Sequence, residues 1–225
     1  GFGQITIADD DESQGAYNDG WVDGDNGGYG FEPWALSSSG GGNYVGGTAI
    51  PDIDAFGIFS NGSGNNSIAE RSFSSPMVAG DTFSVDLGHT NTISGEISLT
   101  LQDGGTTVFT LKFVGGESDW EINDGGSDFG SGQAYAANTK LTFSITLEGN
   151  NKYSYTFGTG SGTNYDFQNR TVTQFTSVKF INNNQGAGQN FGFDNLKVDR
   201  TARIFGAEGW RLLASPITGA TYNDL

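Results

Sequence analysis

The chain has 225 residues, 26 acidic and 10 basic side chains, and a net charge of −16 at pH 7. This charge excludes nucleic acid as a partner and argues against anionic membrane surfaces, because phosphates would repel the protein. Cysteine is absent from the sequence, which excludes disulfide bonds, thiolate metal sites and cysteine nucleophiles. We therefore expect neutral polysaccharide, cations or other proteins as partners, with no nucleic acid and no membrane insertion.

Short β-branched and aromatic runs alternate with clusters of Gly, Asn, Asp and Ser along the chain, whereas helical periodicity is nearly absent. The runs predict strands at 4–8, 43–45, 54–59, 68–73, 82–87, 96–102, 107–114, 120–123, 140–147, 152–157, 173–181 and 190–198. Short strands with polar turns favour an all-β fold, a two-sheet antiparallel β-sandwich of jelly-roll, concanavalin-like type. We assign residues 1–199 to this domain, with a long acidic N-terminal loop.

Alternation within the predicted strands indicates which face is buried. In 107–114, Phe109, Leu111 and Phe113 share one face and form the predicted core side. The same pattern assigns two further sets to the core: Phe83, Val85 and Leu87, and Leu141, Phe143, Ile145 and Leu147.

Residues 200–225 form an apolar segment that follows the predicted last strand. It is interpreted as an edge strand, as the start of a following domain, or as a strand that pairs with another subunit. The last interpretation makes the protein its own partner, or a partner of other surface proteins, since contacts of this kind propagate into filaments when they do not close. The residues that would mediate assembly are Ile204, Phe205, Trp210, Leu212 and Leu213.

The first 70 residues contain 11 acidic side chains and neither lysine nor arginine. Carboxylates without neutralising cations usually face water, a cation or a polar partner, so this segment is the first place to search for function. It contains the string GWVDGDNGGYGFEPW at 20–34, which is followed later by DAFGIF at 54–59 and FDNL at 193–196.

These strings resemble a poorly characterised group of secreted bacterial β-sandwich domains found in exported surface proteins. The resemblance covers roughly residues 8–198 and implies a secreted or cell-surface location in bacteria, without implying an activity. The strand pattern is also similar, at the level of fold, to concanavalin-like lectin and glucanase sandwiches.

A structural calcium ion is one candidate ligand of the acidic segment. Asp9, Asp11, Asp23 and Asp25 offer the hard oxygen ligands that calcium prefers. Similarity to jelly-roll carbohydrate-binding modules implies Asp194, on the last strand, as a further ligand. The alternative is a solvated acidic loop, and no other cofactor is expected.

A glycan-binding face is a second candidate. Trp21 and Tyr29 lie among polar residues that include Asp25 and Asn26, and aromatic rings stack on sugars while Asp and Asn bind hydroxyl groups. The alternative is that the rings anchor the loop onto the sandwich, which is favoured for Trp34.

Glycan hydrolysis is a third candidate. Glu117, Asp119 and Glu121 match the E-x-D-x-E string of laminarinase-type retaining glycosidases, and this resemblance implies nucleophile, assistant and acid/base respectively. Strand alternation would place all three on one face. The outer two must approach to ~5–5.5 Å, whereas a regular strand separates them by ~13 Å. The alternative is an exposed polar strand edge. The single histidine, His89, is predicted to lie in a turn.

Three functions follow from these candidates. We favour a non-catalytic extracellular structural or adhesive surface protein, a filament subunit associating through its C-terminal segment. The alternative is a carbohydrate-binding module of a larger secreted protein. A retaining β-glucan hydrolase, resting on residues 117–121 alone, is the third.

Overall fold

The computed structural model describes residues 3–50, 53–91, 93–186 and 188–201. Within them the one helix is a 3₁₀ turn of three residues, which is too short to cross a membrane. The elements in chain order are β1 Gln4–Asp10, η1 Gly15–Tyr17, β2 Ala35–Ser39, β3 Gly41–Ile50, β4 Ile53–Ser60, β5 Asn66–Val78, β6 Asp81–His89, β7 Glu96–Asp103, β8 Thr106–Val114, β9 Asp119–Asn123, β10 Phe129–Ala134, β11 Leu141–Gly149, β12 Lys152–Phe157, β13 Gly160–Asp166, β14 Gln174–Asn183 and β15 Phe191–Thr201.

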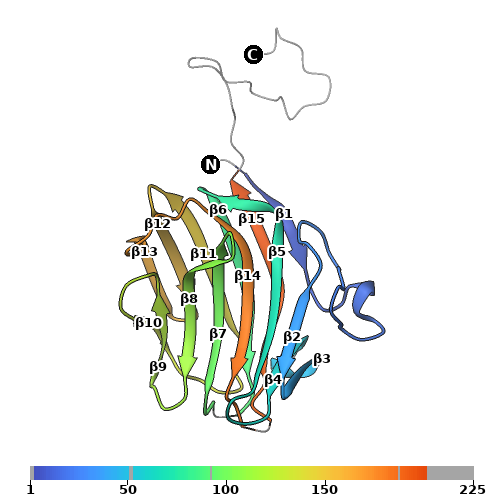
Figure 1. The fold of residues 1–225 in the computed structure, drawn as a ribbon. Coiled ribbons are helices and arrows are strands. Elements are labelled where there is room, and N and C mark those ends of the chain that lie inside the picture. Colours follow the sequence, from blue (N-terminus) through green and yellow to red (C-terminus); the bar gives the residue numbers. More distant parts are fainter. Residues whose placement is uncertain (1–2, 51–52, 92, 187, 202–225) are drawn as a thin grey trace, which may run out of the picture.

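The strands form two antiparallel sheets that pack face to face (Figure 1). One sheet has the order β13-β12-β11-β6-β15-β4-β3, with β1 as an eighth strand beside β15. The other has the order β10-β9-β8-β7-β14-β5-β2. This arrangement confirms the predicted all-β sandwich of jelly-roll type.

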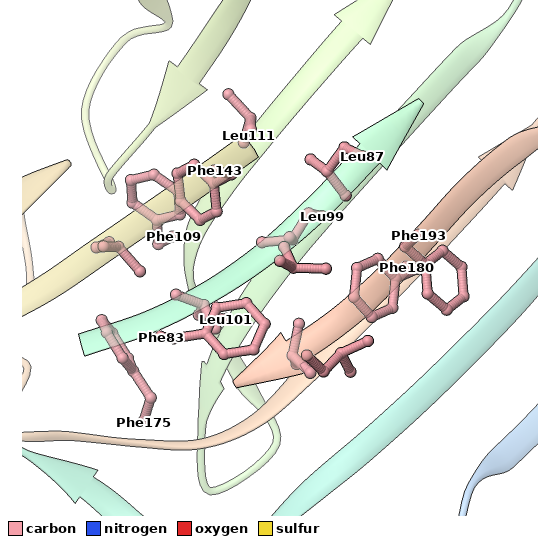
Figure 2. Packing of buried hydrophobic residues seen from close by; sticks show 14 of the residues in the cluster. Phe83, Leu87, Leu99, Leu101, Phe109, Leu111, Phe143, Phe175, Phe180 and Phe193 are labelled. Carbon is pink, nitrogen blue, oxygen red and sulfur yellow. The ribbon is translucent and has the colours of Figure 1, made fainter. Parts of the chain in front are cut away.

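The apolar faces predicted from alternation meet between the sheets. Phe109, Leu111 and Phe113 of β8 are at most 2 % exposed, and the predicted core residues of β6 and β11 are buried as well. Phe180 of β14 stacks on Phe193 of β15, with ring centroids 3.8 Å apart and planes inclined by 6° (Figure 2). Contacts of this kind join the two sheets into one core.

Three strands were not predicted, and all of them lie at sheet edges. They are β2, β10 and β13, with the sequences ALSSS, FGSGQA and GSGTNYD. An edge strand pairs on one side only and leaves much of its surface in water, so its sequence need not carry an alternating apolar face. Pairing to the neighbouring strand sets its conformation instead.

The last strand, β15, changes partners along its length. Phe191–Phe193 pair with β4, whereas Leu196–Thr201 pair with β1. The change coincides with a bulge between Asp194 and Lys197, where Asn195 has a φ of +54°. Beside the bulge the N–H of Glu12 donates to Oδ1 of Asp194 at 3.1 Å, so the polypeptide that follows β1 lies against the last strand.

The sandwich extends two residues beyond its predicted end at residue 199. Arg200 and Thr201 belong to β15, and Nη2 of Arg200 lies 2.7 Å from Oδ2 of Asp81. The predicted assembly residues Ile204, Phe205, Trp210, Leu212 and Leu213 lie outside the described residues, so their role stays a prediction.

The predicted placement of His89 in a turn is wrong. His89 is the last residue of β6 and is 1 % exposed. Its ring stacks on Tyr135, with centroids 4.9 Å apart, and lies 6.2 Å from the ring of Trp120. Packing against aromatic rings, rather than turn formation, therefore explains the position of His89.

Candidate functional site

The acidic N-terminal segment is anchored by one buried arginine. It runs from β1 through η1 to β2 as a long loop beside the edge of the seven-stranded sheet (Figure 1). The fully buried guanidinium of Arg71, on β5, forms an ion pair with Asp10 and donates to the Tyr17 hydroxyl at 3.0 Å. It also donates to the Glu32 carbonyl oxygen at 2.9 Å and to Oδ1 of Asn26 at 2.6 Å. Part of the negative charge is therefore neutralised from inside the protein.

Trp21 belongs to the core and not to a ligand-binding surface. Its ring is 3 % exposed and packs on Trp34 and Phe56, with centroids 5.2 and 4.9 Å away. The predicted glycan-binding role of Trp21 is wrong, because no face of the ring is free for a sugar. Trp34, 1 % exposed, anchors the loop as predicted.

The polar residues predicted beside Trp21 hold the loop itself. Asp25 accepts the N–H of Val22 at 2.8 Å through Oδ2, and Asn26 accepts from Arg71. Tyr29 exchanges two backbone hydrogen bonds of 2.9 Å with Asp9, and its side chain is 53 % exposed. Glycan binding by Tyr29, Asp25 and Asn26 stays a prediction.

Two glycines of the 20–34 string have a steric role. Gly28 and Gly30 have φ values of +63° and +76°, and both pass against the backbone of β1. A Cβ at Gly30 would lie 2.2 Å from the carbonyl oxygen of Ile7, a distance that no side chain can occupy. Gly28 and Gly30 therefore allow the close packing of the loop on β1.

The predicted calcium ligands do not form one site. Asp23 accepts the N–H of Leu36 at 2.8 Å. Asp194, on the last strand, accepts the N–H of Glu12 at 3.1 Å. Burial, and then the nearby carboxylates of Glu12 and Asp11, raise the pKa of Asp194 to about 7. No group of three or more Asp, Glu or His side chains in the described part of the chain could hold a metal ion. The predicted ligands therefore form no such group, and calcium binding stays a prediction for Asp9, Asp11, Asp23, Asp25 and Asp194.

The E-x-D-x-E string is divided between a turn and a strand. Glu117 lies in the turn after β8, where its N–H donates to the carbonyl oxygen of Val114 at 3.1 Å, and β9 begins at Asp119. The predicted alignment of three carboxylates on one strand face is therefore wrong for Glu117. Asp119 is exposed, and Glu121 lies 3.8 Å from Nζ of Lys112. Hydrolysis by these residues stays a prediction, without the strand geometry on which it was based.

The outer face of the seven-stranded sheet carries two sets of interacting polar side chains. They occupy strand positions that alternate with core residues, so they point away from the other sheet. We call this surface the polar face and define it by Glu70 of β5, Ser177 and Lys179 of β14, Gln102, Ser98 and Thr100 of β7, Lys112 of β8, Glu121 and Asn123 of β9, and Asp128 before β10.

The first set joins β5, β14 and β7. Nζ of Lys179 lies 3.0 Å from Oε2 of Glu70. The amide of Gln102 is oriented by its partners: its nitrogen lies 2.8 Å from Oε1 of Glu70, and its oxygen 3.3 Å from Nζ of Lys179. Ser177 donates to Oε1 of Glu70 at 3.2 Å. Each of these groups is held by the others, which fixes their orientation.

The second set joins β8 and β9. Nζ of Lys112 lies 2.6 Å from Oδ2 of Asp128 and 3.8 Å from Oε2 of Glu121. Asn123 donates to Oδ1 of Asp128 at 2.8 Å. The hydrogen bond from Lys112, followed by that from Asn123, holds the pKa of Asp128 below its usual value. This carboxylate is therefore ionised at neutral pH.

Two small hydroxyl residues of β7 separate the two sets. Thr100 is opposite Lys179, and Ser98 is opposite Lys112. The lysine side chains are only 23 % and 19 % exposed, and Ser98 and Thr100 are 1 % and 5 % exposed. Ser98 and Thr100 are therefore almost fully covered, although they lie on the outer face of the sheet opposite the two lysines. Oγ1 of Thr100 has no hydrogen-bond partner among the described residues.

The polar face can recognise a ligand rich in hydroxyl groups. It offers carboxylate and amide acceptors beside ammonium and amide donors, and the half-buried cross-strand pair Ile68 and Ile181 adds apolar surface next to them. Such a mixture of oriented polar groups and apolar contact is typical of small-molecule and glycan sites. Among the predicted site residues only Glu121, with Asp119 at its margin, lies here. The sequence signal that could have identified the polar face is the set of residues that alternate with the predicted core residues and therefore point outward.

No protein-family model matches the chain, and no curated protein sequence matches it. Several solved structures, however, match its fold. A sialidase aligns with a TM-score of 0.59 and 11 % identity over 75 % of this chain, which spans 17 % of that protein's length. The conserved carbohydrate esterase vb_24B_21 from Shiga toxin-encoding bacteriophage phi24B aligns with a TM-score of 0.58 and 14 % identity, over 89 % of this chain and 100 % of the other. The cellulose induced protein Cip1 aligns with a TM-score of 0.53 and 14 % identity, over 77 % and 94 %. At these identities the similarity shows a shared β-sandwich fold and nothing more specific.

Proposed function

We propose that this chain is a carbohydrate-binding module of a larger secreted protein, and that it binds a neutral polysaccharide on its polar face. The observation that carries the proposal is the pair of fixed networks, Glu70–Lys179–Gln102 and Lys112–Glu121–Asp128, on either side of β7. Because these side chains already hold one another in place, little side-chain entropy is lost when they bind sugar hydroxyl groups.

Charge and fold support a neutral glycan in particular. A net charge of −16 disfavours polyanionic chains, whereas it leaves the affinity for uncharged polysaccharides intact. The similar structures include a carbohydrate esterase and a cellulose-induced protein, which supports a carbohydrate ligand.

The test is binding of the purified chain to a panel of neutral oligosaccharides and insoluble polysaccharides, followed by calorimetry on the best ligand. Glu70→Gln and Glu121→Gln should each weaken binding about tenfold or more, since a hydrogen bond to a charged group contributes ~1.5–3 kcal/mol. Glu148→Gln, an exposed change on β11 of the other sheet, is the matched control and should bind like the parent. Absence of binding to every neutral glycan, or equal binding by all variants, would overturn the proposal.

A further inference from the structure

A separate groove of about 460 Å³ lies where the turn between β7 and β8 meets the loop before β14. Its volume falls within the ~300–1,000 Å³ typical of small-molecule sites. The residues that line it are not those of the polar face networks: they include Asp103, Thr106, Thr107, Asn169, Arg170 and Thr171.

Arg170 carries an unpaired charge in this groove. Of the eight lysines and arginines that the structure describes, seven form an ion pair with a carboxylate, and Arg170 is the exception within the described ranges. The chain has 26 acidic residues for 10 basic ones, so carboxylates are abundant on its surface. A cation that remains without one of them is available to a ligand.

The guanidinium is held in place while most of its donors stay free. Its Nη1 donates to the carbonyl oxygen of Thr107, and the Arg170 carbonyl oxygen accepts from Nδ2 of Asn151 at 3.0 Å. Nε lies close to Gly125, where a Cβ would come within 2.4 Å of it. Nε and Nη2 have no acceptor among the described residues, and two adjacent guanidinium donors match the geometry of a carboxylate.

The rest of the groove is suited to a polyhydroxylated molecule. The hydroxyl groups of Thr106, Thr107 and Thr171 have no hydrogen-bond partner in the described part of the chain. Oδ1 of Asp103 accepts from Nε2 of Gln174 at 2.9 Å, which leaves its second oxygen free. A simple anion would be repelled by Asp103, whereas a ligand with a carboxylate at one end and hydroxyl groups at the other satisfies both charged residues.

We propose that this groove binds an acidic sugar, with the sugar carboxylate on Arg170 and its hydroxyl groups on Asp103 and the threonines. The inference goes beyond the proposed function, because it concerns another surface and another ligand class. It holds whether or not the polar face binds a neutral glycan.

The experiment is an NMR or calorimetric titration of the whole chain with glucuronate and galacturonate, with glucose and acetate as comparison ligands. At least one uronate should bind about tenfold more tightly than glucose and acetate, a factor that corresponds to 1.4 kcal/mol. Arg170→Gln should lose this preference, and Thr171→Val, which removes one exposed hydroxyl group, should weaken uronate binding with less risk to folding. Lys152→Gln, which makes the same change in net charge on β12, should bind like the parent.

Equal affinity for uronate, glucose and acetate, or uronate binding that Arg170→Gln leaves unchanged, would overturn the inference. Failure to bind either uronate would do the same. Glu70→Gln separates the two proposals, because it should weaken binding of a neutral glycan and leave uronate binding unchanged.

Discussion

Replacing Arg71 with alanine tests whether the acidic loop is anchored from inside the protein. The variant leaves the fully buried carboxylate of Asp10 without its partner, and breaking a buried pair in this way costs ~3–5 kcal/mol. The guanidinium also lies over the rings of Phe31 and Trp34, 5.0 and 4.9 Å from their centroids, so lost packing acts in the same direction. For a domain of this size each kcal/mol lowers Tm by roughly 2–4 °C, so we expect a drop of about 6–20 °C.

The loss should depend on pH. Burial raises the pKa of Asp10 to about 6, although Arg71 and the Tyr17 hydroxyl act to lower it. Without Arg71 the effect of burial is less opposed, and the pKa rises further. A raised pKa stabilises the folded state when the group is protonated, so this contribution is fully present below pH ~3.8 and is lost as pH rises through the folded pKa. The destabilisation by Arg71→Ala should therefore be largest at neutral pH and shrink on acidification.

The assay is urea unfolding of the parent, Arg71→Ala, Asp10→Asn and the double variant, at neutral and mildly acidic pH. The double variant should cost less than the sum of the single ones, because no buried charge remains unpaired. Lys152→Ala is the control: its pair with Asp166 is 35 % and 58 % exposed, and such surface pairs contribute under ~1 kcal/mol. A loss for Arg71→Ala no larger than for Lys152→Ala, or one independent of pH, would refute the reasoning.

Four further outcomes are expected. Gly30→Ala should lower Tm more than Gly24→Ala, since both glycines have positive φ but only Gly30 lacks space for a Cβ; equal effects would contradict the steric argument. His89→Phe should be nearly neutral at pH 7, because both ring nitrogens are buried and neither has a hydrogen-bond partner among the described residues. Burial lowers the pKa of His89 to about 4, so the parent should lose stability that the variant keeps as pH falls from ~6.5 through 4. Chelation should leave Tm unchanged, and a drop would show that a metal binds the folded chain. Deleting 204–225 should abolish any filaments seen by electron microscopy, and filaments of the truncated chain would reject assembly through that segment.

The sequence predicts the interior strands of this fold well, because the alternation of apolar and polar residues that identifies them lies within each strand. From Phe109 onward the residues of β8 alternate between buried and partly exposed, and the alternation of Phe109, Leu111 and Phe113 is readable without knowledge of any partner strand. The edge strands β2, β10 and β13 could not be read in the same way. Their conformation depends on hydrogen bonds to one neighbour, and nothing in a run such as ALSSS specifies that neighbour.

The acidic segment shows the limit of counting charges along a chain. Its carboxylates look unneutralised because the first 70 residues contain no basic side chain, yet the neutralising group is the next residue, Arg71. Arg71 lies on β5 with its side chain toward the core, where it meets Asp10, Tyr17 and Asn26 together. The segment that first suggested a ligand site is therefore in large part an internal anchor, with Tyr29 as its exposed aromatic side chain.

The polar face shows why a site on a sheet is hard to predict even when its strands are known. Its members alternate with predicted core residues, as Lys112 does between Leu111 and Phe113, so their outward direction follows from the same pattern. Their grouping depends on register between strands: Glu70 meets Lys179 because β14 pairs with β5, and Lys112 lies opposite Ser98 because β8 pairs with β7. That register is set by long-range packing, since a slip of one residue would bury the lysines and expose the phenylalanines. The core that fixes the register is therefore also what assembles the proposed glycan-binding surface.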